Sequence, residues 1–91
     1  MIQFEKNYLE YIQRKGVGSR DRVASSPASY VSYLRSVSRF LDCEISPKLL
    51  SSESDVVTVA QRLKGKCAAA TIRNYCSAMR QYVAMVNDLG L

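Results

Sequence analysis

The residue types best suited to chemistry recur on one side of a predicted helix near the end of the 91-residue chain. Positions three or four residues apart project from the same flank of a helix at successive turns. Six residues lie on this flank or beside it: Arg73, Asn74, Ser77, Arg80, Gln81 and Ala84. An arginine can hold a phosphate or the O6/N7 edge of guanine with two hydrogen bonds, and Asn or Gln can pair with adenine. These residue types favour a helix that lies along or in the major groove of DNA.

The segment just before this helix offers further groups for phosphate. Lys64 and Lys66 precede the helix, and Thr71 lies at its expected start. The first backbone amides of a helix lack intrahelical partners and carry the positive end of the helix dipole, so they attract anions. We therefore expect Lys64, Lys66 and Thr71 to add phosphate contacts.

The net charge is concentrated in the same region. The chain carries 13 Lys and Arg against 8 Asp and Glu, for a formal net charge of +5. Residues 56–87 contain five of the bases and no acid, so elsewhere the remaining bases and acids balance. A local field of one sign concentrates polyanions and releases their counterions on contact, which makes nucleic acid the leading partner class. The alternative is a solvated basic surface that binds nothing.

Two further arginines lie on an earlier predicted helix. Arg35 and Arg39 are one turn apart, on the side opposite its apolar stripe. They are weaker candidates for DNA contact, because they could instead form ordinary surface ion pairs with Asp42 or Glu44.

Catalysis, metal binding and cofactor binding are not expected. The chain has no histidine, its carboxylates share no helical face, and GKCAAAT lacks the spacing of a phosphate-binding loop. Cys43, Cys67 and Cys76 form no CxxC pair, so we expect free thiols, with Cys76 in the core. The N-terminus lacks the apolar run of a signal peptide, and no stretch approaches the roughly 20 apolar residues of a membrane span. We expect a cytoplasmic protein.

The candidate DNA-contacting side chains must be positioned by helices. The chain contains only 4 Gly and 2 Pro, and no segment alternates apolar with polar residues as a half-buried strand would. Its hydrophobic content of 47% is typical of a folded soluble domain. We predict one all-α domain over residues 1–91: a compact bundle of four main helices plus a short connecting helical turn.

Short-range signals mark the helix ends. The first helix is predicted at residues 2–15, followed by a polar, basic loop at 16–25. Ser26-Pro27 is a strong helix start, because the hydroxyl can cap a free amide and proline already has a helical φ. Ser46-Pro47 repeats this signal before the single helical turn.

Serines and glycines bound the remaining two helices. Ser52 or Ser54 is expected to cap the third helix, which Gly65 ends. The last helix is predicted to begin within residues 68–71 and to end before Gly90. The predicted apolar faces of the four helices are, in order, Phe4, Tyr8, Tyr11 and Ile12; Tyr30, Leu34, Val37 and Leu41, widened by Val31, Tyr33 and Phe40; Val56, Val59, Ala60 and Leu63; Ile72, Tyr75, Cys76, Met79, Val83 and Val86.

Two segments resemble a known family. SPASYVSYLRSVSRFLD, residues 26–42, resembles the Tyr-x3-Leu-Arg-x4-Phe-Leu helix in the core-binding domain of tyrosine recombinases and phage integrases. ATIRNYCSAMRQYV, residues 70–83, resembles the closing helix of that domain, in which a Thr-Ile start leads to a Ser-Ala-Leu-Arg core. Here that core is Ser77, Ala78, Met79 and Arg80, and Ala68 stands where the family often places a capping serine.

The resemblance implies a SAM-like helical bundle that clamps one side of duplex DNA, in service of site-specific recombination or DNA integration. In that family a separate C-terminal domain cuts and rejoins strands through a tyrosine nucleophile. The chain has no histidine for the accompanying His-x-x-Arg motif, so no tyrosine here is expected to be the nucleophile. We therefore expect DNA binding without catalysis, through the second and fourth helices, with any catalytic domain downstream of Leu91.

Two alternatives remain open. The chain could be the DNA-recognition module of a restriction-type nuclease, or a helical protein-interaction domain whose basic face meets an acidic partner. The sequence does not indicate an oligomeric state.

Overall fold

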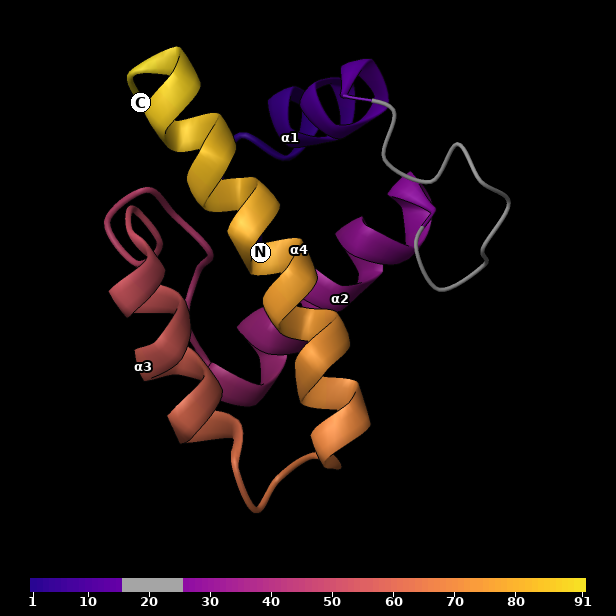
Figure 1. The fold of residues 1–91 in the computed structure, drawn as a ribbon, viewed down its shortest axis with the longest axis vertical. Helices are drawn as coiled ribbons and strands as arrows, with labels where there is room; N and C mark the ends of the chain where they lie inside the picture. The colour runs from indigo at the N-terminus through magenta and orange to yellow at the C-terminus, as the bar shows by residue number, and fades with distance from the viewer. Residues whose placement is uncertain (16–25) are drawn as a thin grey trace.

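The computed structural model describes residues 1–15 and 26–91, and these residues form an all-α fold (Figure 1). Its helices are α1 (Glu5–Arg14), α2 (Pro27–Leu41), α3 (Glu53–Leu63) and α4 (Ala69–Leu89). The predicted class, four main helices with a short turn between the second and third, is confirmed. The loop expected at 16–25 lies outside the described residues. Within the described ranges, no helix is long and apolar enough to cross a membrane.

Local capping signals set most helix starts as predicted. The Ser26 hydroxyl accepts a hydrogen bond from the Ser29 amide at 3.1 Å, and Pro27 follows it in the first turn of α2. The Ser52 hydroxyl caps α3 by accepting from the Asp55 amide at 3.3 Å. Each cap satisfies an amide that the helix itself leaves unpaired. In the connection between these helices, the Leu49 and Leu50 amides donate to Ser46 O at 3.0 and 2.9 Å, which forms the expected single turn.

The start of the first helix differs from the prediction. Residues 2–4 lie outside α1, because Ile2 pairs with Ile45 in an isolated parallel bridge. The Gln3 amide donates to Ile45 O at 2.8 Å, and the Ile45 amide donates to Met1 O at 2.9 Å. Phe4 then takes a left-handed conformation with φ of 59° and is 42% exposed, so its predicted place on the apolar helical face is wrong. Backbone pairing with a distant segment has replaced the first turn.

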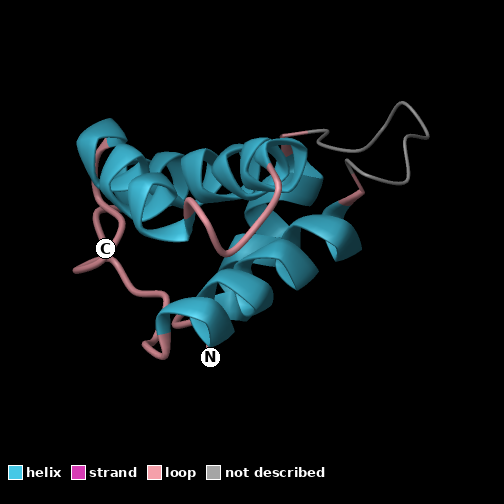
Figure 2. Ribbon diagram, turned by 90° about the horizontal axis from the view of Figure 1, so that it is seen from below, coloured by secondary structure: helices cyan, strands magenta, loops and turns pink. Residues whose placement is uncertain are grey.

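The helix α4 lies at the centre and packs against the other three helices. Seen from below, α2 lies in one layer while α3 and α4 lie in the other (Figure 2). The inner face of α4 buries Tyr75, Cys76, Ala78, Met79, Tyr82, Met85 and Val86. Phe40, predicted on the widened apolar face of α2, is instead 41% exposed. Fully buried Ile45 and Leu50, from the connection between α2 and α3, complete the core. This burial leaves one long flank of α4 facing solvent.

Candidate nucleic-acid interface

The solvent flank of α4 carries the polar residues that the helical spacing placed there. Arg73, Asn74 and Arg80 are exposed, because the buried residues of α4 occupy the opposite side. Ser77 is half-buried, and its hydroxyl donates to Arg73 O at 3.2 Å. Its proton is thus used within the helix, and its oxygen keeps acceptor capacity. Gln81 and Ala84 are half-buried at the edges of this flank.

The turn between α3 and α4 presents two lysines. Gly65 has φ of +85°, a conformation that a residue with a Cβ rarely adopts. The Lys66 and Cys67 amides both donate to Leu63 O, at 3.0 and 3.2 Å, and hold the turn closed. Lys64 and Lys66 are exposed on this turn. The turn itself lies at the lower end of the molecule in Figure 1. Two cations are therefore displayed on an ordered turn at the entrance to α4.

The first turn of α4 leaves its amides without a side-chain cap. Ala68 precedes the helix in an extended conformation and offers no side-chain hydrogen bond. Ala68, Ala69 and Ala70 are all exposed, and Thr71 is half-buried. The first amides of a helix have no intrahelical acceptor, and Lys66 lies only two residues before Ala68 in the chain. This end of α4 combines positive charge with small side chains that allow close approach.

Within residues 1–15 and 26–91, no acidic side chain pairs with Lys64, Lys66 or Arg73. The ion pairs among the described residues are Lys15 with Asp88, Arg35 with Glu5, and Arg80 with Glu53. No hydrogen bond of the described residues uses the charged end of any of these three side chains.

Arg62, which was not among the predicted site residues, is also exposed in the last turn of α3. Its membership of the acid-free segment 56–87 is the sequence signal that could have found it.

Arg80 differs from these cations because folding gives it an acidic neighbour. The Arg80 Nε donates to both carboxylate oxygens of Glu53, at 3.2 and 3.1 Å. Glu53 lies in the first turn of α3, 27 residues earlier in the chain. The segment 56–87 is therefore free of acids in sequence but not in space. No local pattern could have indicated this pair, since it depends on how α3 packs against α4.

Arg35 and Arg39 lie on another surface. The Arg35 Nε and Nη2 donate to the two carboxylate oxygens of Glu5 at 3.3 and 2.8 Å, and this pairing raises the pKa of the guanidinium. The Arg39 Nη2 donates to the Ser36 hydroxyl at 3.3 Å. Neither arginine pairs with Asp42 or Glu44, the partners considered from sequence.

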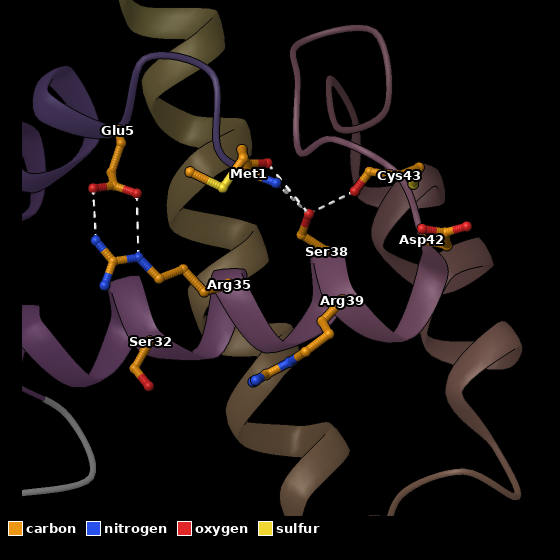
Figure 3. Close-up of a pocket in the computed structure, with 8 residues that line it drawn as sticks. All are labelled: Met1, Glu5, Ser32, Arg35, Ser38, Arg39, Asp42 and Cys43. Carbon is orange, nitrogen blue, oxygen red and sulfur yellow. Dashed lines mark hydrogen bonds and ion pairs between the residues drawn. The ribbon is translucent and has the colours of Figure 1, made fainter.

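These two arginines line an open cavity of about 650 Å³ together with Met1 and Cys43 (Figure 3). In that view α4 passes behind α2, so the cavity lies on the side of α2 remote from α4. The flank of α2 that meets α4 carries Tyr33 instead, whose ring lies 5.7 Å from that of Tyr75. The structure therefore brings together the predicted residues of α4 and the α3–α4 turn, but not Arg35 and Arg39.

No protein-family model, no curated protein and no solved structure matches this chain. The function is therefore inferred from the residues and their geometry.

The described residues offer little for other chemistry. Among them, no three His, Cys, Asp or Glu side chains are grouped so that they could hold a metal ion. All three cysteines are free thiols, and Cys76 is buried as predicted. Burial raises the pKa of the Cys76 thiol, which keeps it protonated and unreactive at neutral pH. The exposed, uncompensated cations at the start of α4 are the feature that most favours a binding function.

Proposed function

We propose that this domain binds duplex DNA without catalysis, through the solvent flank of α4 and the turn between α3 and α4. One observation carries the proposal: Lys64, Lys66 and Arg73 are exposed, have no acidic partner among the described residues and adjoin the uncapped start of a long helix. A solvated basic surface needs no such arrangement, whereas a phosphate backbone is held by lysines, arginines and helix N-terminal amides together.

The dimensions of α4 suit a major groove. Its 21 residues extend over about 30 Å at 1.5 Å per residue. Arg73 and Arg80 are two turns apart on this flank, with the small residues Ser77 and Ala84 beside them. A groove about 12 Å wide admits one helix, and small side chains let the helix backbone approach the base edges. In the proposed complex Lys64 and Lys66 hold a phosphate strand, while Asn74, Arg80 and Gln81 face the bases.

The biological context that we propose follows the resemblance of residues 26–42 and 70–83 to the core-binding domain of tyrosine recombinases. The all-helical fold supports this comparison at the level of fold class. In this context the domain grips DNA for site-specific recombination or integration, and strand cleavage belongs to a further domain of the polypeptide. We leave Arg35 and Arg39 out of the interface, because Glu5 holds Arg35 and both line the remote side of α2.

Salt-dependent binding to labelled duplex DNA tests the proposal. Wild-type affinity should fall steeply as salt rises, because each phosphate contact releases condensed counterions. The double variant Lys64→Gln/Lys66→Gln should bind more weakly on every sequence, and its salt slope should be lower by about 1 for each phosphate that is no longer neutralised. If the wild-type protein does not bind duplex DNA even at low salt, the proposal is wrong.

A matched control removes the same charge elsewhere. Lys6 and Arg14 are exposed on α1, at the opposite end of the molecule from the α3–α4 turn (Figure 1). Lys6→Gln/Arg14→Gln should therefore retain most of the affinity. Equal weakening in both double variants would show that only net charge matters. Competition by poly-glutamate as strong as that by DNA would instead favour an acidic protein partner.

A further inference from the structure

The two arginine–carboxylate pairs of the described residues differ in which donors they use. Arg35 uses Nε and Nη2 against the two oxygens of Glu5. Arg80 uses Nε alone, and both oxygens of Glu53 accept from it. A guanidinium has five N–H donors, four of them on the two terminal nitrogens. All four terminal donors of Arg80 therefore remain available for an incoming group.

The position of Glu53 is fixed by the packing of α3 on α4. Glu53 follows the capping residue Ser52 in the first turn of α3, whose next inward residue, Val56, is buried. The Asn87 side chain on α4 donates to Ser51 O at 3.1 Å, which ties the segment before α3 to the same helix that carries Arg80. These contacts hold the backbone at Glu53 close to α4, while the paired side chains of Arg80 and Glu53 stay 53% and 61% exposed.

The charge of Glu53 affects phosphates and bases differently. A carboxylate about 3 Å from the guanidinium cancels much of its long-range field and repels a second anion that approaches. The edge of a guanine base is neutral, and its O6 and N7 atoms accept two parallel hydrogen bonds from an arginine. Binding of a phosphate is therefore weakened by Glu53 more than binding of a guanine is.

From this arrangement we infer that Glu53 positions Arg80 to recognise guanine, and that Arg80 is a base-recognising residue rather than a phosphate ligand. The inference rests on the proposed DNA-binding function and assigns different roles to its cations. Lys64, Lys66 and Arg73, which form no ion pair with the acids that the structure describes, hold phosphates. Arg80, whose Nε is anchored, presents its terminal nitrogens to a G·C pair.

Selection from a randomised duplex pool, followed by single-atom substitution, tests the inference. The wild-type protein should select duplexes with a guanine at one fixed position. Replacing that guanine by 7-deazaguanine, which lacks the N7 acceptor, should weaken binding roughly tenfold. Arg80→Ala should abolish this preference, because alanine has no side-chain donor for the O6 and N7 atoms.

The variant Glu53→Gln tests whether Glu53 positions the Arg80 guanidinium or only lowers the local positive charge. It should reduce the preference for guanine over 7-deazaguanine by several-fold, while affinity for unrelated duplexes rises or stays constant. Glu10→Gln is the matched control, since Glu10 is an exposed carboxylate of α1 and the change in net charge is the same. It should leave the preference unchanged. Thermal melting confirms that each variant is folded.

Three results would overturn the inference. A Glu53→Gln protein that binds both duplexes more tightly by the same factor would show that Glu53 only screens charge. Wild-type binding without any guanine preference would remove the role of Arg80 but leave the proposed function intact. Absence of all duplex binding by the wild type would overturn the proposed function, and the inference with it.

Discussion

Two tyrosines join distant segments through both ring and hydroxyl. Tyr8 and Tyr82 are fully buried, with ring centroids 5.8 Å apart. The Tyr8 hydroxyl donates to Ala78 O at 2.9 Å, and the Tyr82 hydroxyl donates to Gln3 O at 2.8 Å. Burial, with a smaller contribution from the charge of Glu44, raises the pKa of Tyr82 to about 12. Burial also raises the pKa of Tyr8 well above its ordinary value.

These shifts predict that the domain becomes less stable in alkali. The unfolded tyrosines ionise near pH 10, whereas the folded ones stay neutral, so the unfolded state holds fewer protons above that pH and is favoured as the pH rises. The free energy of unfolding should be constant with respect to these groups below pH 10 and should fall as the pH rises from about 10 toward 12. Urea denaturation at several pH values measures this fall.

Tyr82→Phe is the variant that checks the cause. It should cost about 1 kcal/mol at pH 7, because Gln3 O is left without its donor, and it should make the alkaline fall shallower. An alkaline fall of unchanged steepness in this variant would assign the effect to other groups.

The exposed arginines of α4 should contribute to binding and little to stability. Arg73→Ala together with Arg80→Ala should weaken DNA binding while the unfolding free energy changes by less than about 1 kcal/mol. Both side chains lie off the buried face, and an exposed ion pair such as that of Arg80 with Glu53 contributes about 0–1 kcal/mol. DNA titration and thermal melting of the same preparation measure the two effects. Loss of folding would instead give these arginines a structural role.

Like α1, the longer helix α4 begins without a side-chain cap. The helices α2 and α3 begin with serine caps, whereas Ala68 places a methyl group where a hydroxyl would accept an amide hydrogen bond. Its backbone already has the extended conformation of a capping residue, with φ of −66° and ψ of 153°. A polar side chain at this position needs no backbone change to act as a cap.

Ala68→Ser and Ala68→Asp should therefore both stabilise the domain, and they should differ in DNA binding. Each should add about 1 kcal/mol, which raises Tm by roughly 4–8 °C in a domain of this size. Ala68→Ser occupies one of the first amides of α4 without adding a charge, so it should weaken DNA binding only slightly. Ala68→Asp places a negative charge among Lys66 and the first amides of α4, so it should weaken binding several-fold. Equal DNA affinity in the two variants would remove the start of α4 from the interface.

For the whole molecule, the connection between α2 and α3 is where the N-terminal segment is held. Ile45 is fully buried there and pairs with the segment before α1. The buried Ser38 on α2 donates to Cys43 O at 2.6 Å, and its hydroxyl also accepts from the Met1 amino group at 2.7 Å. The N-terminal residues, α2 and the connection to α3 are thereby held as one unit.

Ile45→Ala should be strongly destabilising for this reason. Deleting a buried isoleucine side chain costs about 2–5 kcal/mol, a large share of the total stability of a small domain. Val57→Ala is the control, because Val57 is 47% exposed on α3, and it should cost less than about 0.5 kcal/mol. Urea denaturation of both variants measures the difference. Similar costs in the two variants would mean that the segment around Ile45 contributes little to the fold.

Most helix boundaries could be predicted from sequence because their causes are local. The caps at Ser26 and Ser52 act within three residues, and Gly65 and Gly90 adopt the positive φ values that end or follow a helix. The spacing of apolar residues also placed Arg73 and Arg80 correctly on the outer flank of α4. The start of α1 was predicted wrongly, since Ile2 pairs with a residue 43 positions away.

The electrostatic environment of the candidate site depends on contacts that no local pattern contains. Glu53 reaches Arg80 across 27 residues, and Glu5 reaches Arg35 across 30, because packing of the helices brings their flanks together. The number of charges is fixed by the amino-acid composition. The helix on which each charge lies follows from interactions within about one turn. Which charges stay free, as at Lys64, Lys66 and Arg73, follows from the packing of the bundle, because ion pairing requires proximity in space rather than in sequence.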